Sequence, residues 1–465
     1  MDAAPIPADL TGALARPASR SLLRVLGLVF GLAVVVGSMI GSGIMRAPGV
    51  VALGITSPPL ILLAWALGGG LAMLTAMPLV EAGASVPHAG GAYPIVTRAF
   101  GPTVGFFGGW LAWIQNVAAN GFLSAVFAEY VHRLGIAQAV PAGVLACGLI
   151  LAVAGINWVG TRFSGASQSL ASAIKGAAFF VLVVILFASP RAHAAAPAPA
   201  LPLITSVGAL VMAVRVIYQT YAGWEAAIYF SEEVHRPDRN VARATFWGIG
   251  AVTVLYLLIN ASVLHVLSPA ALAGSPLAVG DAAKVSLGPL ADTVITALGL
   301  FSLAAIVNLQ IMSASRVTWR MARDGALPPA LAAVATKGSP RRSIAVIVIV
   351  SLIFAATGTY ESLVRIYAPW SIGAILMICL SAIRLRFTEP DLLRPWRMPL
   401  FPWVAIVSIA IQAALIVVFV VDDPVAGAAS AVVAFAPIPI YLIFARRWRS
   451  QAERLRGVTP AETAP

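Results

Sequence analysis

Twelve apolar runs, each long enough to cross a bilayer, recur along this chain. A membrane-spanning helix needs about 20 residues, and 60% of the residues are hydrophobic while only 10% are charged. Ordinary soluble domains carry about 25% charged residues, so none could bury this much apolar surface. The sequence therefore predicts an all-α integral membrane protein with twelve transmembrane helices, at about 22–53, 59–82, 102–133, 141–157, 161–189, 205–231, 241–267, 286–320, 342–358, 361–384, 402–421 and 424–445.

The positive charges are unevenly distributed between the two sides of such a bundle. With the N-terminus inside the cell, 23 of the 30 Lys and Arg residues lie in cytoplasmic segments. This bias is the usual signature of membrane topology. We expect a multi-pass protein of the cytoplasmic (inner) membrane, with cytoplasmic tails at 1–21 and 447–465. The net charge of +12 thus reports topology and gives no sign of a nucleic-acid partner.

Metal and cofactor sites are not indicated. Cys147 and Cys379 both lie in apolar runs, as small core residues do. The five histidines show no metal-ligand spacing. The first apolar run is too long for a signal peptide and lacks a cleavage site, so we expect it to be retained.

The first run is interrupted by Gly37, Gly41 and Gly43. Each interior glycine costs a helix about 1 kcal/mol relative to alanine. A break at membrane depth would present bare amides of residues 42–44, which suit a carboxylate, and carbonyls of residues 38–40, which suit an ammonium group. Such a break could hold both ends of an amino acid. The alternative is a helix-packing face made by Gly37 and Gly41.

The sixth run repeats this pattern. It places the small pair Ala222-Gly223 in mid-span, between Tyr221 and Trp224, with the carboxylate of Glu225 next to them. Two glycine-interrupted spans five spans apart are typical of an inverted repeat with a binding site at the bilayer midplane.

Four motifs in order along the chain resemble those of amino acid permeases of the amino acid/polyamine/organocation superfamily. They are Pro-His-Ala-Gly-Gly-Ala-Tyr-Pro at 87–94 with Arg-Ala-Phe-Gly-Pro at 98–102, Glu-Glu-Val-His-Arg-Pro-Asp-Arg-Asn at 232–240, Met-Ala-Arg-Asp-Gly-Ala-Leu-Pro at 321–328, and the loop 384–399. The resemblance implies a LeuT-type fold with a 5+5 inverted repeat, discontinuous helices 1 and 6, a ten-helix core at 22–384 and two peripheral helices at 385–446. Departures from the family pattern are Ala92, Arg46 and Gln219.

The breaks and the resemblance together give a candidate substrate site. In the third run Trp113, Asn116 and Asn120 share a helix face, and polar groups at membrane depth often line a substrate path; interhelical hydrogen bonding is the alternative. Asn120 also matches a substrate-contacting asparagine of related arginine/agmatine exchangers. The candidate residues are Ile40, Gly41, Ser42, Gly43, Ile44, Asn116, Asn120, Gln219, Tyr221, Ala222, Gly223 and Trp224.

Lys175 and Glu225 are candidates for ion coupling. A lysine at mid-membrane costs about 2.5–3.5 kcal/mol unless it finds acceptors, and carbonyls of the broken first helix would suit it; snorkelling is the alternative. The resemblance implies that Lys175 occupies the place of Na⁺ in sodium-coupled relatives. Burial favours the neutral form of Glu225, which makes it a candidate proton carrier. A structural carboxylate is the other interpretation.

Arg46 and Arg215 lie beyond the two breaks, on the outer side. By position Arg46 resembles a gating arginine of sodium-coupled transporters, with Glu361 as a partner. An anion-attracting vestibule and snorkelling to the headgroups are the alternatives, and Arg215 has no assigned role.

The sequence thus predicts a secondary transporter that moves amino acids by alternating access, coupled to protons and independent of sodium. Exchange of amino acids or polyamines without protons is the alternative. A membrane enzyme is disfavoured because no nucleophile–base or metal spacing occurs. A channel or receptor is disfavoured because the loops are short and no continuous polar stripe appears. The oligomeric state is not indicated.

Overall fold

The computed structural model describes residues 22, 27–190, 202–275, 277–357 and 360–456. Within these ranges the chain is helical, apart from turns and one isolated bridge between Ile55 and Ile204. The helices are α1 (Leu28–Met39), α2 (Ser42–Gly54), α3 (Pro58–Ser85), α4 (Ala92–Phe100), α5 (Pro102–Arg133), α6 (Ala142–Val159), α7 (Thr161–Ala188), α8 (Val207–Thr220), the 3-10 helix η2 (Trp224–Phe230), α9 (Pro237–Val266), α10 (Pro269–Leu272), α11 (Ala278–Leu287), α12 (Leu290–Arg323), the 3-10 helix η3 (Pro329–Ala332), α13 (Arg341–Thr357), α14 (Tyr360–Thr388), α15 (Trp403–Asp422), α16 (Pro424–Phe435) and α17 (Pro437–Arg456).

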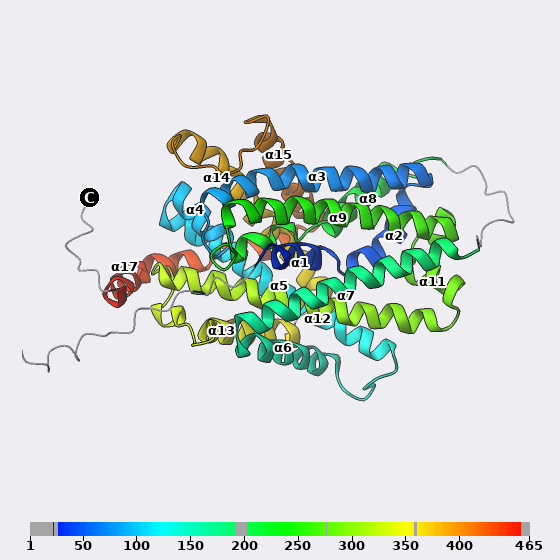
Figure 1. Ribbon diagram of the computed structural model, residues 1–465, viewed down its shortest axis with the longest axis horizontal. Helices are drawn as coiled ribbons and strands as arrows, with labels where there is room; N and C mark the ends of the chain where they lie inside the picture. The colour runs from blue at the N-terminus through cyan, green and yellow to red at the C-terminus, as the bar shows by residue number, and fades with distance from the viewer. Residues whose placement is uncertain (1–21, 23–26, 191–201, 276, 358–359, 457–465) are drawn as a thin grey trace, which may run out of the picture.

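The long helices lie side by side along one axis, as Figure 1 shows. The short helix α4 and the C-terminal helix α17 lie at one end of this bundle, on the left of the figure, and we call it the α4 end. Helices α2 and α11 lie toward the opposite end, which we call the α11 end (Figure 1).

In the described part of the chain, nine helical segments are long and apolar enough to cross a membrane, or ten if α1 and α2 count as one bent span. Two further predicted spans correspond to α8 with η2 and to α13, which are too short or too interrupted to count by length alone. Each of the twelve apolar runs therefore contains helix. The prediction of an all-α membrane protein is confirmed.

Both predicted interruptions are present. Helices α1 and α2 meet at an angle of 44° around Ile40 and Gly41. Helix α8 ends at Thr220, and after a turn the chain continues as the 3-10 helix η2. In the first run the cause is the cluster of glycines, which weakens the helix locally.

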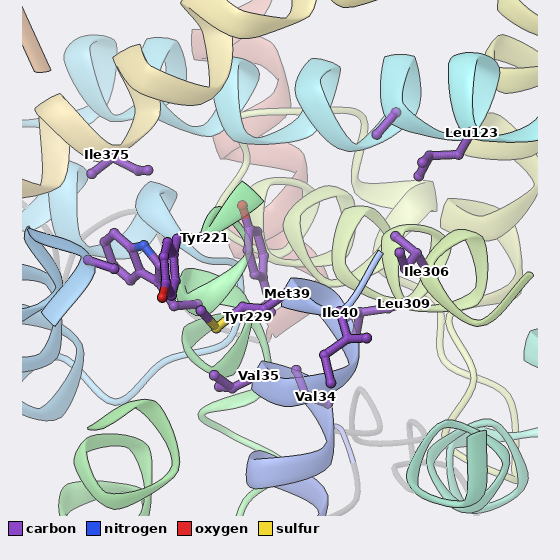
Figure 2. Packing of buried hydrophobic residues seen from close by; sticks show 14 of the residues in the cluster. Val34, Val35, Met39, Ile40, Leu123, Tyr221, Tyr229, Ile306, Leu309 and Ile375 are labelled. Atoms are coloured by element: carbon purple, nitrogen blue, oxygen red, sulfur yellow. The ribbon is translucent and has the colours of Figure 1, made fainter. Parts of the chain in front are cut away.

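Helix α5 runs through the middle of the protein, and 83% of its most apolar stretch is buried. In α15 and in the segment formed by α16 and α17 the corresponding shares are 28% and 22%, so these last helices expose most of their surface. Apolar side chains from α1, α5, α12 and α14 form the core around the first break (Figure 2), among them Val34, Ile40, Leu123, Leu309 and Ile375.

Candidate functional site

A cavity of about 860 Å³ lies between the two interrupted spans. It extends from the breaks to the turn between α15 and α16, and α5, α12 and α14 complete its wall. From the first span it is lined by Ser38, Met39, Gly41, Gly43, Arg46, Ala47 and Val50; from the second by Met212, Arg215, Val216, Gln219, Thr220, Ala222, Gly223, Glu225, Ala226 and Tyr229.

The first break exposes backbone to this cavity at Gly41 and Gly43. The first residues of an α-helix have amides without intrahelical partners, and among the described side chains none caps the start of α2. The start of α2 therefore offers donors and the positive end of a helix dipole to the cavity. The side chains of Ile40 and Ile44 are fully buried in the apolar core, so these two residues can meet a ligand only through their backbone.

Two carbonyls of the first break already accept hydrogen bonds from side chains of the protein. The Ile40 carbonyl accepts a hydrogen bond from Ser302 Oγ at 3.0 Å, and the Met39 carbonyl accepts one from the Tyr256 hydroxyl at 2.6 Å. The prediction that these carbonyls receive an ammonium group is therefore weakened for residues 39 and 40.

Gly223 forms the second break. Its φ of 109° favours glycine, and a Cβ at this position would lie 3.0 Å from the backbone of Ser38. Its carbonyl accepts a hydrogen bond from Ser38 Oγ at 2.6 Å, and its amide donates to Glu225 Oε2 at 3.0 Å. The two breaks are thus in direct contact, and Glu225 is fixed by backbone at the cavity wall.

Tyr256 of α9 connects the ends of both half-helices and was missed by the sequence analysis. Its hydroxyl lies 2.6 Å from the carbonyl oxygen of Met39, the last residue of α1, and 3.1 Å from that of Thr220, the last residue of α8. A tyrosine in an apolar run looks like an ordinary core residue. The sequence signal that could have found it is a hydroxyl in the middle of an apolar run, because a buried hydroxyl requires a hydrogen-bond partner. In the structure the side chain is fully buried.

Lys175 of α7 is fully buried, and its Nζ donates to the carbonyl of Gly37 at 2.7 Å. The expected type of partner, a carbonyl of the broken first span, is therefore the one observed, and snorkelling is excluded in this conformation. Gly37 also packs closely on α7, since a Cβ there would lie 2.1 Å from Ser172 Oγ. The packing interpretation thus holds for Gly37, whereas Gly41 and Gly43 line the cavity.

The two candidate asparagines of α5 point in different directions, and the alternative of interhelical hydrogen bonding describes Asn120. Asn116 lines the cavity, with its Nδ2 3.4 Å from the hydroxyl of Tyr229. Asn120 is fully buried and donates to Ser351 Oγ of α13 at 3.1 Å. Asn120 follows Asn116 by four residues, and four residues rotate an α-helix about 40° past one full turn. This rotation directs the Asn120 side chain toward α13 and away from the cavity.

Tyr221 and Trp224 do not line the cavity either, contrary to the expectation that they shape it. Tyr221 packs against Trp65 and Tyr256, and its hydroxyl donates to the Trp65 carbonyl at 2.9 Å. Trp224 is buried beside a small hollow behind the cavity wall. The turn at Gly223 directs both rings into the protein core, while Gln219 and Ala222 face the cavity.

Three arginines line the cavity. Arg215 pairs with Asp422 at 2.9 Å and lies over the ring of Phe419, and Arg365 pairs with Asp423 at 2.9 Å. Among the residues that the structure describes, Arg46 Nε has no hydrogen-bond partner, and it is shielded from solvent. The side chain of Glu361, the predicted partner of Arg46, lies outside the described residues, and the structure therefore does not test the predicted gate.

Polar residues of α12, α14 and η2 complete the wall and were not predicted. They are Tyr229, Gln310, Ser313 and Tyr367. The Tyr229 hydroxyl accepts a hydrogen bond from Gln115 Nε2 at 3.0 Å, and Ser313 Oγ is buried with no partner in the described part of the chain. A spacing rule on α12 could have found Gln310 and Ser313, which lie three residues apart on one helix face.

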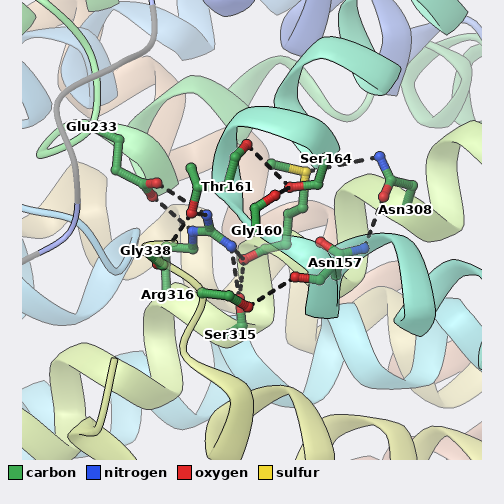
Figure 3. Close-up of polar contacts among 11 residues, drawn as sticks. Asn157, Gly160, Thr161, Ser164, Glu233, Asn308, Ser315, Arg316 and Gly338 are labelled. Atoms are coloured by element: carbon green, nitrogen blue, oxygen red, sulfur yellow. Dashed lines mark hydrogen bonds and ion pairs between the residues drawn. The ribbon is translucent and has the colours of Figure 1, made fainter. Parts of the chain in front are cut away.

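Between the cavity and the α4 end, a buried ion pair joins three segments (Figure 3). Arg316 of α12 donates to both carboxylate oxygens of Glu233, at 2.7 and 3.0 Å, and to Thr161 Oγ1 at the start of α7. Glu233 belongs to the 232–240 motif, and Arg316 lies a few residues before the 321–328 motif; the sequence analysis made neither a site candidate.

This arrangement suits a small dipolar ligand. The start of α2 and the guanidinium of Arg46 offer donors, and Glu225 and the polar groups of the second break offer acceptors. Among the described residues, no three His, Cys, Asp or Glu side chains come together as metal ligands.

Comparisons with known proteins agree with this picture. The chain is 28% identical to the b(0,+)-type amino acid transporter 1 of Mus musculus over 87% of its length and 84% of that protein. It is 26% identical to the Asc-type amino acid transporter 1 of Mus musculus, over 95% of this chain and 85% of the relative. It is 25% identical to the serine/threonine exchanger SteT of Bacillus subtilis (strain 168), over 90% and 96%.

The match to a family model is equally extensive. The model described as amino acid permease covers residues 26–444, which include both interrupted spans and every helix that lines the cavity. With this match, the interrupted spans and the cavity between them, the chain belongs to the amino acid permease family of multi-pass membrane transporters.

Proposed function

We propose that this protein carries α-amino acids across the cytoplasmic membrane by alternating access, coupled to protons and independent of sodium. The observation that supports this best is the cavity between two contacting helix breaks, with the uncapped start of α2 on one side and Glu225 on the other. Amides at a helix start bind carboxylates well, and a carboxylate opposite them suits an ammonium group.

In this proposal the substrate carboxylate binds the amides of residues 42–44. The ammonium group binds near Ala222 and Glu225, because the Met39 and Ile40 carbonyls already accept hydrogen bonds from Tyr256 and Ser302. Gln219 and Asn116 contact the side chain of the substrate.

Lys175 supports sodium independence. Its ammonium group occupies the space beside the Gly37 carbonyl, and a cation already held there removes the need for Na⁺. Glu225 is the proposed proton carrier, since it lines the cavity and its partner is a backbone amide instead of a fixed cation.

The orientation proposed from the charge distribution puts the α4 end in the cytoplasm. Helix α4, which carries Arg98, and helix α17, which carries Arg446, Arg447 and Arg449, lie at this end (Figure 1). The cavity, which extends toward the α11 end, then faces outward in this conformation.

Exchange without proton coupling is the second candidate, because one of the relatives is named a serine/threonine exchanger. The test is uptake of radiolabelled amino acids by proteoliposomes, with and without an inward pH gradient, with and without sodium, and with and without internal amino acid.

The proposal expects uptake that rises with the pH gradient and is unchanged when choline replaces sodium. Uptake that requires internal amino acid and ignores the gradient would establish exchange instead. If no amino acid binds or moves under any condition, the proposal is wrong.

A further inference from the structure

The charged groups that line the cavity are unequally compensated. Arg215 is neutralised by Asp422 and Arg365 by Asp423, each at 2.9 Å. Arg46 forms no ion pair with any carboxylate that the structure describes, and its Nε is shielded from solvent with no hydrogen-bond partner. A shielded donor without a partner is unfavourable, so this side chain is prepared to receive an acceptor.

Arg46 lies on the face of α2 that is directed at the ligand. Gly43, Arg46, Ala47 and Val50 all line the cavity, and their spacing of three, four and seven residues defines one side of a helix. Gly43, in the first turn of α2, lies on the same side, about 4.5 Å along the axis from Arg46, because each residue advances about 1.5 Å. Two anion-binding groups, one turn apart, thus face the same space.

The opposite wall carries a carboxyl group. Glu225 lines the cavity beyond the second break, with one carboxylate oxygen held by the Gly223 amide. The cavity therefore offers two places for an anion on α2 and one for a cation at Glu225.

We propose that the preferred substrate is a dicarboxylic amino acid, and that Arg46 binds the side-chain carboxylate. This inference rests on the proposed function. The α-carboxylate binds the start of α2, the ammonium group faces Glu225, and the second carboxylate meets the guanidinium. Arginine binds carboxylates through two parallel N–H···O bonds, which makes the pair both strong and directional.

A gate would behave differently. If Arg46 only closes the cavity over any bound substrate, its loss affects all substrates alike. If it binds the side chain, its loss affects acidic substrates selectively.

The test compares L-glutamate and L-aspartate with the uncharged isosteres L-glutamine and L-asparagine, by binding to the purified full-length protein and by competition for uptake in proteoliposomes. The wild-type protein should bind glutamate at least tenfold tighter than glutamine. Arg46→Gln should weaken glutamate binding roughly 10- to 100-fold, as expected for loss of a charged hydrogen bond, and change glutamine binding less than about threefold.

The double variant Arg365→Gln/Asp423→Asn is the control, since it removes a cavity arginine together with its partner, keeps the net charge of the cavity, and should leave the glutamate-to-glutamine ratio unchanged. Arg46→Lys keeps the charge and should retain part of the preference. If Arg46→Gln does not fold, the glutamate-to-glutamine ratio of the wild type and of Arg46→Lys still tests the inference.

Three outcomes overturn the inference. The first is a wild-type protein that prefers glutamine or does not discriminate. The second is equal loss of both ligands in Arg46→Gln. The third is binding of neutral amino acids alone, which contradicts the inference about Arg46 and leaves the proposed function intact. If no amino acid binds at all, the inference and the proposed function are both wrong.

Discussion

The ion pairs on the two sides of the cavity, Arg316 with Glu233 and Arg215 with Asp422, differ in character. Toward the α4 end, the side chains of Arg316 and Glu233 are 2% and 0% exposed. Toward the α11 end, Asp422 of the pair with Arg215 is 63% exposed. Removing one partner of a buried pair costs about 3–5 kcal/mol, whereas an exposed pair contributes about 0–1 kcal/mol.

This difference matches the position of the cavity, because its lining includes both exposed pairs and neither residue of the buried pair. The buried pair joins the turn after η2 to α12, and Arg316 also bonds to Thr161 of α7, so separating this pair requires both charges to be hydrated at once. In the alternating access proposed above, opening this side is therefore the more costly step.

The largest predicted effect comes from leaving one buried charge alone. Glu233→Gln or Arg316→Met should lower the free energy of unfolding by about 3–5 kcal/mol, measured as thermal stability of the purified protein in detergent. The double variant should be more stable than either single variant, because neither charge is then unpaired. Single variants as stable as the wild type would show that this pair is hydrated and not buried.

A smaller effect is predicted for Thr161→Val. Thr161 Oγ1 accepts a hydrogen bond from Arg316 Nη2 at 3.2 Å. Hydrogen bonds to charged groups contribute about 1.5–3 kcal/mol, and the same thermal measurement should detect the loss. Thr388→Val, whose hydroxyl bonds only to its own helix at Arg384, is the matched control and should change little.

Acid should weaken the cluster next to the buried pair, beyond the end of η2. Burial raises the pKa of the Glu232 carboxyl, but a hydrogen bond from His88 and the charges of Arg320 and Arg323 outweigh this and hold the pKa below its usual value. Because the folded pKa is lower than the unfolded value of about 4.3, the contribution is present above that value and is lost as the pH falls through the folded pKa.

The measurement is the difference in thermal stability between the wild type and Glu232→Gln across this pH range. The difference should be largest near neutral pH and shrink in acid. A difference that stays constant as the pH falls would contradict the assignment.

The smallest effect is predicted at the exposed end. Asp422→Asn and Asp423→Asn should each change the free energy of unfolding by no more than about 1 kcal/mol, and added salt should reduce the difference further. If either variant lowered the free energy of unfolding as much as Glu233→Gln does, the buried and the exposed ion pairs would not differ in their contribution to stability.

The general architecture could be predicted from local sequence properties. The length of the apolar runs predicted the spans, and the glycine cluster predicted the first break. Because a buried ammonium group needs an acceptor, we expected Lys175 to bond to a carbonyl of the first span, and it does. These properties depend on the residue and its near neighbours, so the sequence contains them directly.

The direction of individual side chains could not be predicted in the same way. Asn120 faces Ser351, and Tyr221 faces Trp65, because distant segments provide the partners that fix the rotation of each helix. Tyr256 was missed for the same reason, since its two carbonyl partners lie on other helices.

The position of Tyr256 has a consequence for movement. A phenol has one proton, so at any instant it can satisfy only the carbonyl of Met39 or that of Thr220. If α1 shifts against α8, the hydroxyl can turn its proton from one oxygen to the other, so one of the two helix ends keeps its donor while the other is released. Tyr256 thus offers two alternative hydrogen bonds at the junction of the two interrupted spans.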